Sequence, residues 1–409
     1  MLTGKLSVRQ FYDHRSLWAI TGVAVRIGQR LGLHRDGTSL GLSIFESEMR
    51  RRLWWQIVIL DSRSAALSGS GASVMAHLWD TKPHLNINDS DLSPNMREPP
   101  LEHTGLTEMT FCMLRLEIGR FMQHSDSSGT FDGEKHSSSS IAMLLVERDK
   151  TIDELERVLQ RKFLRFCDPM IPLHVLVAGV ARCAICKFRL IAHHPRQYSE
   201  GLKTMPQREK DMLFSNCLKM VEEANIIHSN KSTQRFLWHV KVYFQLEALA
   251  YTLSALRQRT TGDLVARAWS QLGQLFEHYP EMLTDRKNAL FVAIQNMTIK
   301  AWEARETAFA RDSQSHSGTK LKPPRLISTL LSHRRPIMTA SAVALNMDDC
   351  SHMPSRSQMS EQHQTNDIYP SDQGFLSDIS SNYGLPISSD SFQADLDSME
   401  WAYLDELLR

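Results

Sequence analysis

The stretch from Ile141 to Phe166 reads IAMLLVERDKTIDELERVLQRKFLRF, and its apolar residues recur every three or four positions. A helix with 3.6 residues per turn places residues at this spacing on one face. The apolar stripe consists of Ile141, Leu145, Ile152, Leu155, Leu159, Phe163 and Phe166. Charged residues such as Glu147, Lys150 and Glu154 fall off the stripe. The pattern therefore predicts a long amphipathic helix with one buried face.

The same period continues downstream almost to residue 309. It predicts helices at 173–194, 207–228, 233–257, 263–278 and 286–310. Prolines 172, 195, 206 and 280 stand at the joints between them, where proline interrupts a helix. No strand-like alternation of useful length occurs. We therefore expect an all-α fold, with a multi-helical domain followed by a largely disordered C-terminal tail.

Two further helices are expected upstream. The first covers residues 13–33, and Gly32 suits the left-handed position that ends a helix. The second begins at Ser43, where Ser43 and Glu46 match a capping box, and fades by about residue 68. Its pairs Glu46–Arg50 and Glu48–Arg52 are four residues apart, which is typical of exposed ion pairs on a helix.

The stretch between these helices and Ile141 is less regular. Residues 77–100 contain four prolines and several turn-forming Asn and Asp residues, so we expect an irregular but ordered segment. A helix is predicted from Thr107 to about Gln123. Residues 124–140 are rich in Ser, Gly and His and are expected to form a loop or a disordered insertion.

Composition and charge divide the 409 residues into three parts. Residues 1–356 carry a net charge of +10, whereas residues 357–409 hold ten acidic residues and one basic residue. After Arg311 the composition shifts to Ser, His, Pro, Gln and Asp, which bury little surface. We expect a helical domain over 1–310, a disordered linker over 311–390 and an acidic-hydrophobic segment over 391–409.

Residues 391–409 combine bulky apolar groups with carboxylates. Such a segment stays solvated because its charges resist collapse, and its apolar side chains can fold onto a groove of a partner. This is the composition of an acidic activation segment, with candidate contact residues Phe392, Leu396, Met399, Trp401, Tyr403, Leu404 and Leu407. A C-terminal helix docked on the body is the alternative interpretation.

No residue pattern in the sequence amounts to a catalytic or metal site. Cys183 and Cys186 form a CxxC, but no second CxxC or pair of suitably spaced histidines accompanies it, so buried structural cysteines are favoured over a metal or redox role. The longest apolar stretch, residues 171–186, contains His174 and Arg182 and is too short and too charged to span a bilayer. We expect neither an enzyme nor a membrane protein.

Arginines 50–52 stand beside Trp54 and Trp55, which is the combination that single-stranded nucleic acids prefer. The apolar stripe of this helix buries at least one of the tryptophans, and Glu46 and Glu48 are placed to neutralise arginines. A structural role is therefore favoured over a nucleic-acid patch.

Three segments, in order, resemble the signatures of one family. Residues 16–37, SLWAITGVAVRIGQRLGLHRDG, are similar to the first signature helix of the fungal-specific transcription factor domain. This domain is the middle homology region of zinc binuclear cluster regulators. Residues 45–61, FESEMRRRLWWQIVILD, and 79–92, WDTKPHLNINDSDL, resemble its second and third signatures. The signature residues are Leu33, His34, Arg35, Asp36, Arg51, Arg52, Leu53, Trp54, Trp55, Asp61, Asp80, Asn86, Asn88 and Asp89.

The resemblance implies an all-α regulatory domain, a nuclear location and control of transcription, often of a secondary-metabolite gene cluster. In this family a six-cysteine zinc cluster binds DNA, and it precedes the domain. The sequence contains no C-x2-C-x6-C arrangement, so we expect no cofactor in this chain and DNA contact only indirectly or through the N-terminal cluster that it lacks. The expected partners are the transcription machinery or a zinc-cluster transcription factor, in a homo- or heterodimer.

The alternative keeps the fold and changes the role. The helical body is then a small-molecule sensor or an inhibitory partner without activation function, since an apolar interior between helices can host a ligand. An all-α enzyme is a third, disfavoured hypothesis.

Overall fold

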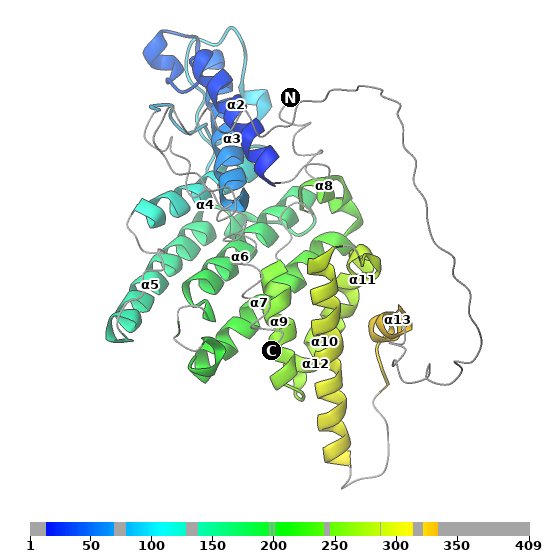
Figure 1. Ribbon diagram of the computed structural model, residues 1–409. Helices are drawn as coiled ribbons and strands as arrows, with labels where there is room; N and C mark the ends of the chain where they lie inside the picture. Colours follow the sequence, from blue (N-terminus) through cyan, green and yellow to red (C-terminus); the bar gives the residue numbers. More distant parts are fainter. Residues whose placement is uncertain are drawn as a thin grey trace, which may run out of the picture. The chain divides into compact units, whose positions relative to one another are not determined.

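The computed structural model describes residues 14–68, 79–127, 138–195, 198, 201–240, 246–286, 288–313 and 322–333 (Figure 1). The helices up to Leu330 belong to one compact unit; a second unit, 331–406, is described only at its first three residues. Every regular element within the described ranges is a helix. In order they are α2 (His14–Arg30), η1 (Gly37–Leu40), α3 (Ile44–Ser68), η2 (Asp89–Asp91), α4 (Thr110–Ser127), α5 (Ser138–Lys162), η3 (Leu164–Phe166), α6 (Pro172–Ala192), η5 (Gly201–Lys203), α7 (Gln207–Ser229), η6 (Lys231–Phe236), α8 (Leu237–Val240), α9 (Leu246–Gln258), α10 (Asp263–His278), α11 (Glu281–Thr284), α12 (Ala289–Ser313) and α13 (Arg325–His333).

The all-α expectation is confirmed for the described part of the chain. In that part, no helix combines the length and the apolar character needed to cross a membrane. The stripe expected over residues 141–166 is confirmed from Leu145 to Phe163, since Leu145, Ile152, Leu155, Leu159 and Phe163 are all buried. Phe166 departs from it, because α5 ends at Lys162 and Phe166 lies half-buried in η3. Their helix, α5, packs on α6.

Helices α2 and α3 form a pair at the N-terminal end of the described chain (Figure 1). Gly28 permits their close approach, because a Cβ there would lie 3.1 Å from Trp54 Cζ3. Gly32 ends α2 in the left-handed conformation, with φ of 71°, as expected. Leu33 N donates to Gly28 O across this turn and closes the helix end.

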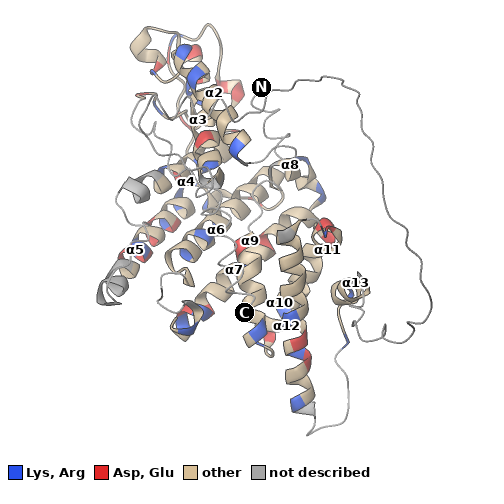
Figure 2. Ribbon diagram, viewed as in Figure 1, with Lys and Arg blue, Asp and Glu red and all other residues tan. Residues whose placement is uncertain are grey.

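Helix α6 lies at the centre of the packing. It contacts α4, α5 and α7, and its small residues Ala178 and Ala181 are buried in these contacts. Helix α7 then packs on α9 and α10, and α9 packs on α12. The ring of Trp269 on α10 meets the ring of Trp302 on α12 edge to face at 5.2 Å. The second half of α12 carries charges of both signs (Figure 2).

The structure differs from the sequence expectations at residues 233–257 and in the expected linker. The single helix expected at 233–257 is divided into η6, α8 and α9, and residues 241–245 lie outside the described ranges. Within the linker expected at 311–390, Arg325–His333 form α13, and Leu326, Ile327 and Leu330 are buried. The expectation of a disordered linker is therefore wrong for these nine residues, because three apolar side chains at helical spacing pack on the helical body.

Of the other segments, the irregular one agrees with the expectation and the described ends of the expected loop do not. Residues 79–100 contain only the short helix η2, as expected for an irregular segment. Of the expected loop at 124–140, residues 124–127 belong to α4 and 138–140 to α5, and the rest lies outside the described ranges. The remainder of 311–390, and all of 391–409, also lie outside the described ranges.

Candidate functional site

The first two signature segments meet in a buried ion pair. Asp36 follows α2, and Arg51 lies in the first half of α3. Arg51 Nε donates to Asp36 Oδ2 and Arg51 Nη2 donates to Asp36 Oδ1, both at 2.8 Å. Because this two-point pairing matches the guanidinium to the carboxylate in both position and orientation, it fixes the α2–α3 turn against α3.

The third signature segment closes over the same carboxylate. Lys82 N donates to Asp36 Oδ2 at 2.9 Å, and Asp36 N donates to Asp80 Oδ1 at 2.7 Å. Thr81 Oγ1 donates to Leu33 O, and Arg35 pairs with Asp80 at 3.2 Å. The Arg51 guanidinium, helped by the Thr38 hydroxyl and by Lys82 N, holds the pKa of Asp36 well below its usual range.

A second buried carboxylate lies one turn before Arg51 and Arg52. Glu48 is 0% exposed, accepts from Leu85 N at 3.1 Å and pairs with Arg52 at 3.1 Å. Burial raises the pKa of Glu48, and Arg52 opposes this shift. The pairs Glu46–Arg50 and Glu48–Arg52 are confirmed. The second is not exposed as expected, because the segment 79–92 covers it.

Arg52 also reaches across to η2, where it pairs with Asp89 Oδ1 at 2.6 Å. The neighbouring asparagines tie this segment to the start of α4. Asn86 Nδ2 donates to His103 O and Gly105 O, and Asn88 Oδ1 accepts from Glu108 N. These bonds hold an irregular segment in one conformation.

The tryptophans of the signatures are buried in the same cluster. Trp54 is 1% exposed, and its ring meets Trp79 edge to face at 5.9 Å. Trp55 Nε1 donates to Lys82 O at 2.9 Å. The ring of His34 lies 6.1 Å from that of Trp54. Neither Trp54 nor Trp55 presents its face to solvent, so the nucleic-acid interpretation of residues 50–55 has no stacking surface.

The structure thus brings together most of the signature residues in what we call the signature cluster. Its members are Leu33, His34, Arg35, Asp36, Arg51, Arg52, Trp54, Trp55, Asp80, Asn86, Asn88 and Asp89. Asp61 lies further along α3, where it accepts from Thr21 Oγ1 at 3.2 Å. Leu53 is 40% exposed and takes no part. The signature cluster consists of paired charges and buried rings that hold the three signature segments together.

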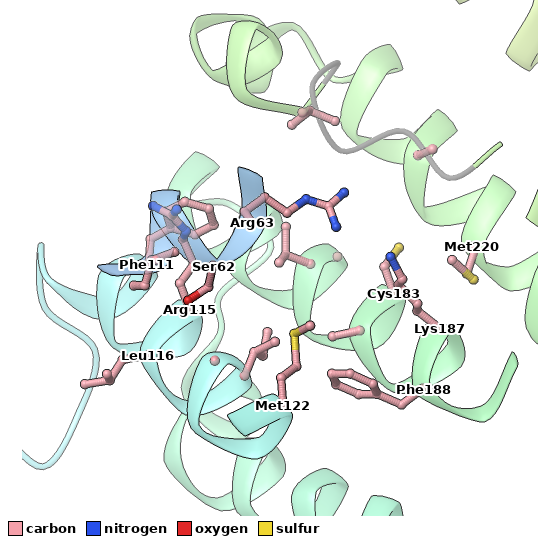
Figure 3. A pocket seen from close by; sticks show the side chains of 18 of the residues that line it. Ser62, Arg63, Phe111, Arg115, Leu116, Met122, Cys183, Lys187, Phe188 and Met220 are labelled. Atoms are coloured by element: carbon pink, nitrogen blue, oxygen red, sulfur yellow. The ribbon is translucent and has the colours of Figure 1, made fainter. Parts of the chain in front are cut away.

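The second half of α3 borders a cavity that the sequence did not indicate. The cavity has a volume of about 250 Å³ and lies between α3, α4, α6 and α7, with further walls from Val240, Ala248 and Tyr279. Its apolar walls include Val58, Phe111, Leu116, Val180, Phe188 and Met220 (Figure 3). No sequence pattern indicates this cavity, because its lining residues come from separate helices that meet only in the folded chain.

Four cations line this apolar space, namely Arg63, Arg115, Arg120 and Lys187, and no carboxylate is among its lining residues. Arg115 donates to Gln56 Oε1, and Arg120 lies 5.8 Å above the ring of Trp55. Lys187 and Cys183 both point toward the cavity from α6, and Arg63 reaches toward them from α3 (Figure 3). Burial, helped by the like charge of Arg63, lowers the pKa of Lys187 to about 8.

The CxxC cysteines behave as structural residues. Burial raises the pKa of Cys186 to about 11 and raises that of Cys183 further, so both thiols are protonated at neutral pH. No group of three or more potential metal ligands occurs in the described ranges. A protonated, buried thiol is a poor metal ligand and a poor nucleophile.

His193 forms the most enzyme-like cluster of the described helices. Its Nε2 lies 2.9 Å from Asp149 Oδ1 and its Nδ1 lies 3.2 Å from Glu209 Oε2, which also binds Tyr198. Both ring nitrogens are engaged by carboxylates, so neither is free to activate a nucleophile. The cluster links α5, α6 and α7.

The candidate activation residues lie outside the described residues, so the structure does not place them. They are Phe392, Leu396, Met399, Trp401, Tyr403, Leu404 and Leu407.

Comparison with known proteins gives one family match and several relatives. Residues 8–161 match the fungal specific transcription factor domain. The aurofusarin cluster transcription factor aurR2 of Gibberella zeae is 37% identical over 304 residues, which cover 74% of this chain and 45% of that protein. The transcriptional regulator AacuB of Aspergillus aculeatus is 32% identical over 304 residues, covering 74% and 41%. The pyriculol/pyriculariol biosynthesis cluster transcription factor 1 of Pyricularia oryzae is 30% identical over 308 residues, covering 74% and 41%.

The chain therefore spans less than half the length of these curated relatives. No solved structure matches the chain.

Proposed function

We propose that the chain, whose residues 8–161 match the fungal specific transcription factor domain, is a member of that family and regulates transcription of a biosynthetic gene cluster in the nucleus. The observation that carries the proposal is the similarity, over 74% of the chain, to proteins named as cluster transcription factors. The proposal makes the chain a regulator and not an enzyme.

Within this role the helical body is the regulatory part. The signature cluster supports this assignment, since Arg51, Arg52 and the two tryptophans of α3 are occupied by Asp36, Glu48 and the segment 79–92. These groups are thereby withdrawn from contact with nucleic acid. We propose that the protein acts on DNA through a zinc-cluster transcription factor, as partner in a homo- or heterodimer.

Residues 391–409 are proposed to contact the transcription machinery. The support is their composition, in which Trp401, Leu404 and other apolar residues alternate with carboxylates. Side chains of this kind bind shallow apolar grooves, and the surrounding charges keep the free segment in solution.

Transcript profiling tests the regulatory role. Deletion of the gene in its host is expected to change the transcripts of a contiguous set of biosynthetic genes, and re-introduction of the gene is expected to restore them. Unchanged transcripts under conditions that produce the metabolite would contradict the proposal.

A tethered reporter tests the activation segment. The whole chain, and separately residues 1–356, would be fused to an unrelated DNA-binding domain. We expect activation by the first and none by the second. Substitution of Trp401 and Leu404 by Ala should abolish activation, whereas the control substitution of Ser388 and Ser389 should preserve it. An inactive whole chain that co-precipitates with a zinc-cluster protein would instead favour the inhibitory role.

A further inference from the structure

We propose that the cavity between α3, α4, α6 and α7 binds a small aromatic molecule that carries one acidic group, with the ammonium of Lys187 as its counter-charge. The site does not depend on the proposed role in transcription. It would give the helical body a ligand of its own.

The size of the cavity limits the apolar part of the ligand. A dry apolar cavity of roughly 150 Å³ accepts one benzene ring, and this cavity holds about 250 Å³. A molecule of two fused aromatic rings is therefore the expected size. Phe111 on α4 and Phe188 on α6 supply aromatic walls, and Met122 and Met220 supply adaptable ones (Figure 3).

The charge of the cavity selects the polar part of the ligand. Lys187 makes no hydrogen bond or ion pair with the described residues, whereas Arg115 is bound to Gln56 and Arg120 lies over Trp55. The charges that act on Lys187 are Arg63, which repels it, and Glu247, which attracts it from α9 without a direct bond. An ammonium in apolar surroundings without a partner destabilises the fold. A carboxylate in the cavity supplies the missing partner.

A neutral or cationic ligand fits these observations less well. A neutral ligand would leave the Lys187 ammonium unpaired after water has been displaced, and a cation would add to the four positive groups in the lining. An acid instead gains from all four, because the cavity lining offers no carboxylate to oppose it.

The test is a calorimetric titration of the purified whole chain at pH 7 with 2-naphthoic acid, and in parallel with 2-naphthamide as its uncharged analogue. We expect the acid to bind at least tenfold more tightly than the amide. Lys187→Met should reduce the affinity for the acid at least tenfold and should not reduce that for the amide. Lys219→Met, which removes an exposed charge from the neighbouring helix α7, should change neither.

A second variant shows where the probe binds. Ala184→Trp fills the cavity from α6 and should abolish binding of both probes, and circular dichroism should confirm that the variant keeps its helical content. Binding of the acid that survives Lys187→Met, or binding of either probe that survives Ala184→Trp, would overturn the proposal. So would a wild-type chain that binds neither probe. The titration measures binding alone, so its failure is distinct from a failure in the transcript or reporter experiments.

Discussion

Asp36 and Arg51 form a buried two-point ion pair between segments fifteen residues apart, with both hydrogen bonds at 2.8 Å. The pair joins the end of α2 to the first half of α3, and Lys82 N adds the third segment to the same carboxylate. The conformation of three signature segments thus depends on one carboxylate.

Removal of the arginine should therefore be severe. Arg51→Met leaves the Asp36 carboxylate buried without its cation, and we expect the free energy of unfolding to fall by about 3–5 kcal/mol. The matched control is Arg50→Met, since Arg50 pairs with a Glu46 that is half exposed. The free energy of unfolding of this variant should fall by about 1 kcal/mol. Urea unfolding measures both, and equal losses would contradict the central role of the pair.

The same pair predicts a dependence on pH. The pKa of Asp36 is lowered in the folded state from an ordinary value of 3.8. Its ionised form therefore stabilises the fold above about pH 4, and this stabilisation is lost progressively as the pH falls further. The difference in unfolding free energy between wild type and Asp36→Asn should be constant from pH 7 to 5 and shrink below 4. A difference that grows in acid would refute the assignment.

Close packing at Gly37 gives a third prediction. A Cβ at Gly37 would lie 2.5 Å from Ser47 Oγ and 2.8 Å from Ser47 Cα, so Gly37→Ala forces η1 away from α3. We expect a loss of about 1–3 kcal/mol. Gly22→Ala is the control, because no atom lies within 4 Å of its Cβ position in α2. It should stabilise the protein by roughly 0.5–1 kcal/mol.

Lys187 should reduce the stability of the protein in the absence of a ligand. Its pKa is lowered to about 8 from an ordinary 10.5, so the charged form is disfavoured by folding. Lys187→Met should therefore raise the unfolding free energy at pH 7 by about 1–3 kcal/mol. This gain should diminish as the pH rises from 8 through 10.5, above which the wild-type amine is neutral in both states. A destabilised variant at pH 7 would show that Lys187 has a structural partner.

Helix α13 should behave as part of the folded body. Ile327 is 0% exposed and Leu331 is 46% exposed on the same helix. Ile327→Ala is expected to lower the unfolding free energy by about 2–4 kcal/mol, whereas Leu331→Ala should change it by less than about 0.5 kcal/mol. Thermal melting of the whole chain distinguishes the two, and indistinguishable variants would mean that α13 does not contribute to the core.

The elements that could be predicted are those with a local signal. The α5 stripe from Leu145 to Phe163 and the helix end at Gly32 depend on spacing and on backbone freedom, and both were predictable. Glu48 was expected to be exposed, but the structure buries it. Its burial depends on a segment more than thirty residues further along the chain, from which Leu85 N donates to the Glu48 carboxylate, so no local pattern indicates it. Helix α13 was missed because its three buried residues are too few to outweigh the polar composition around them.

The cavity could not be predicted from the sequence, for the same physical reason. In the sequence, Lys187 is an ordinary charge in an apolar helix, and only the assembly of the helices shows that no described residue pairs with it. The relation of Trp54 to Trp79 is likewise a property of the folded chain.

Helix α3 runs without interruption for 25 residues, or about 37 Å. The first half of α3 holds the charges of the signature cluster, and residues from Trp55 to Arg63 form one wall of the cavity. Trp55 belongs to both regions, since it lines the cavity and donates through Nε1 to Lys82 O. A ligand that shifts Trp55 would therefore also act on the third signature segment, because the two regions share a side chain as well as a helix.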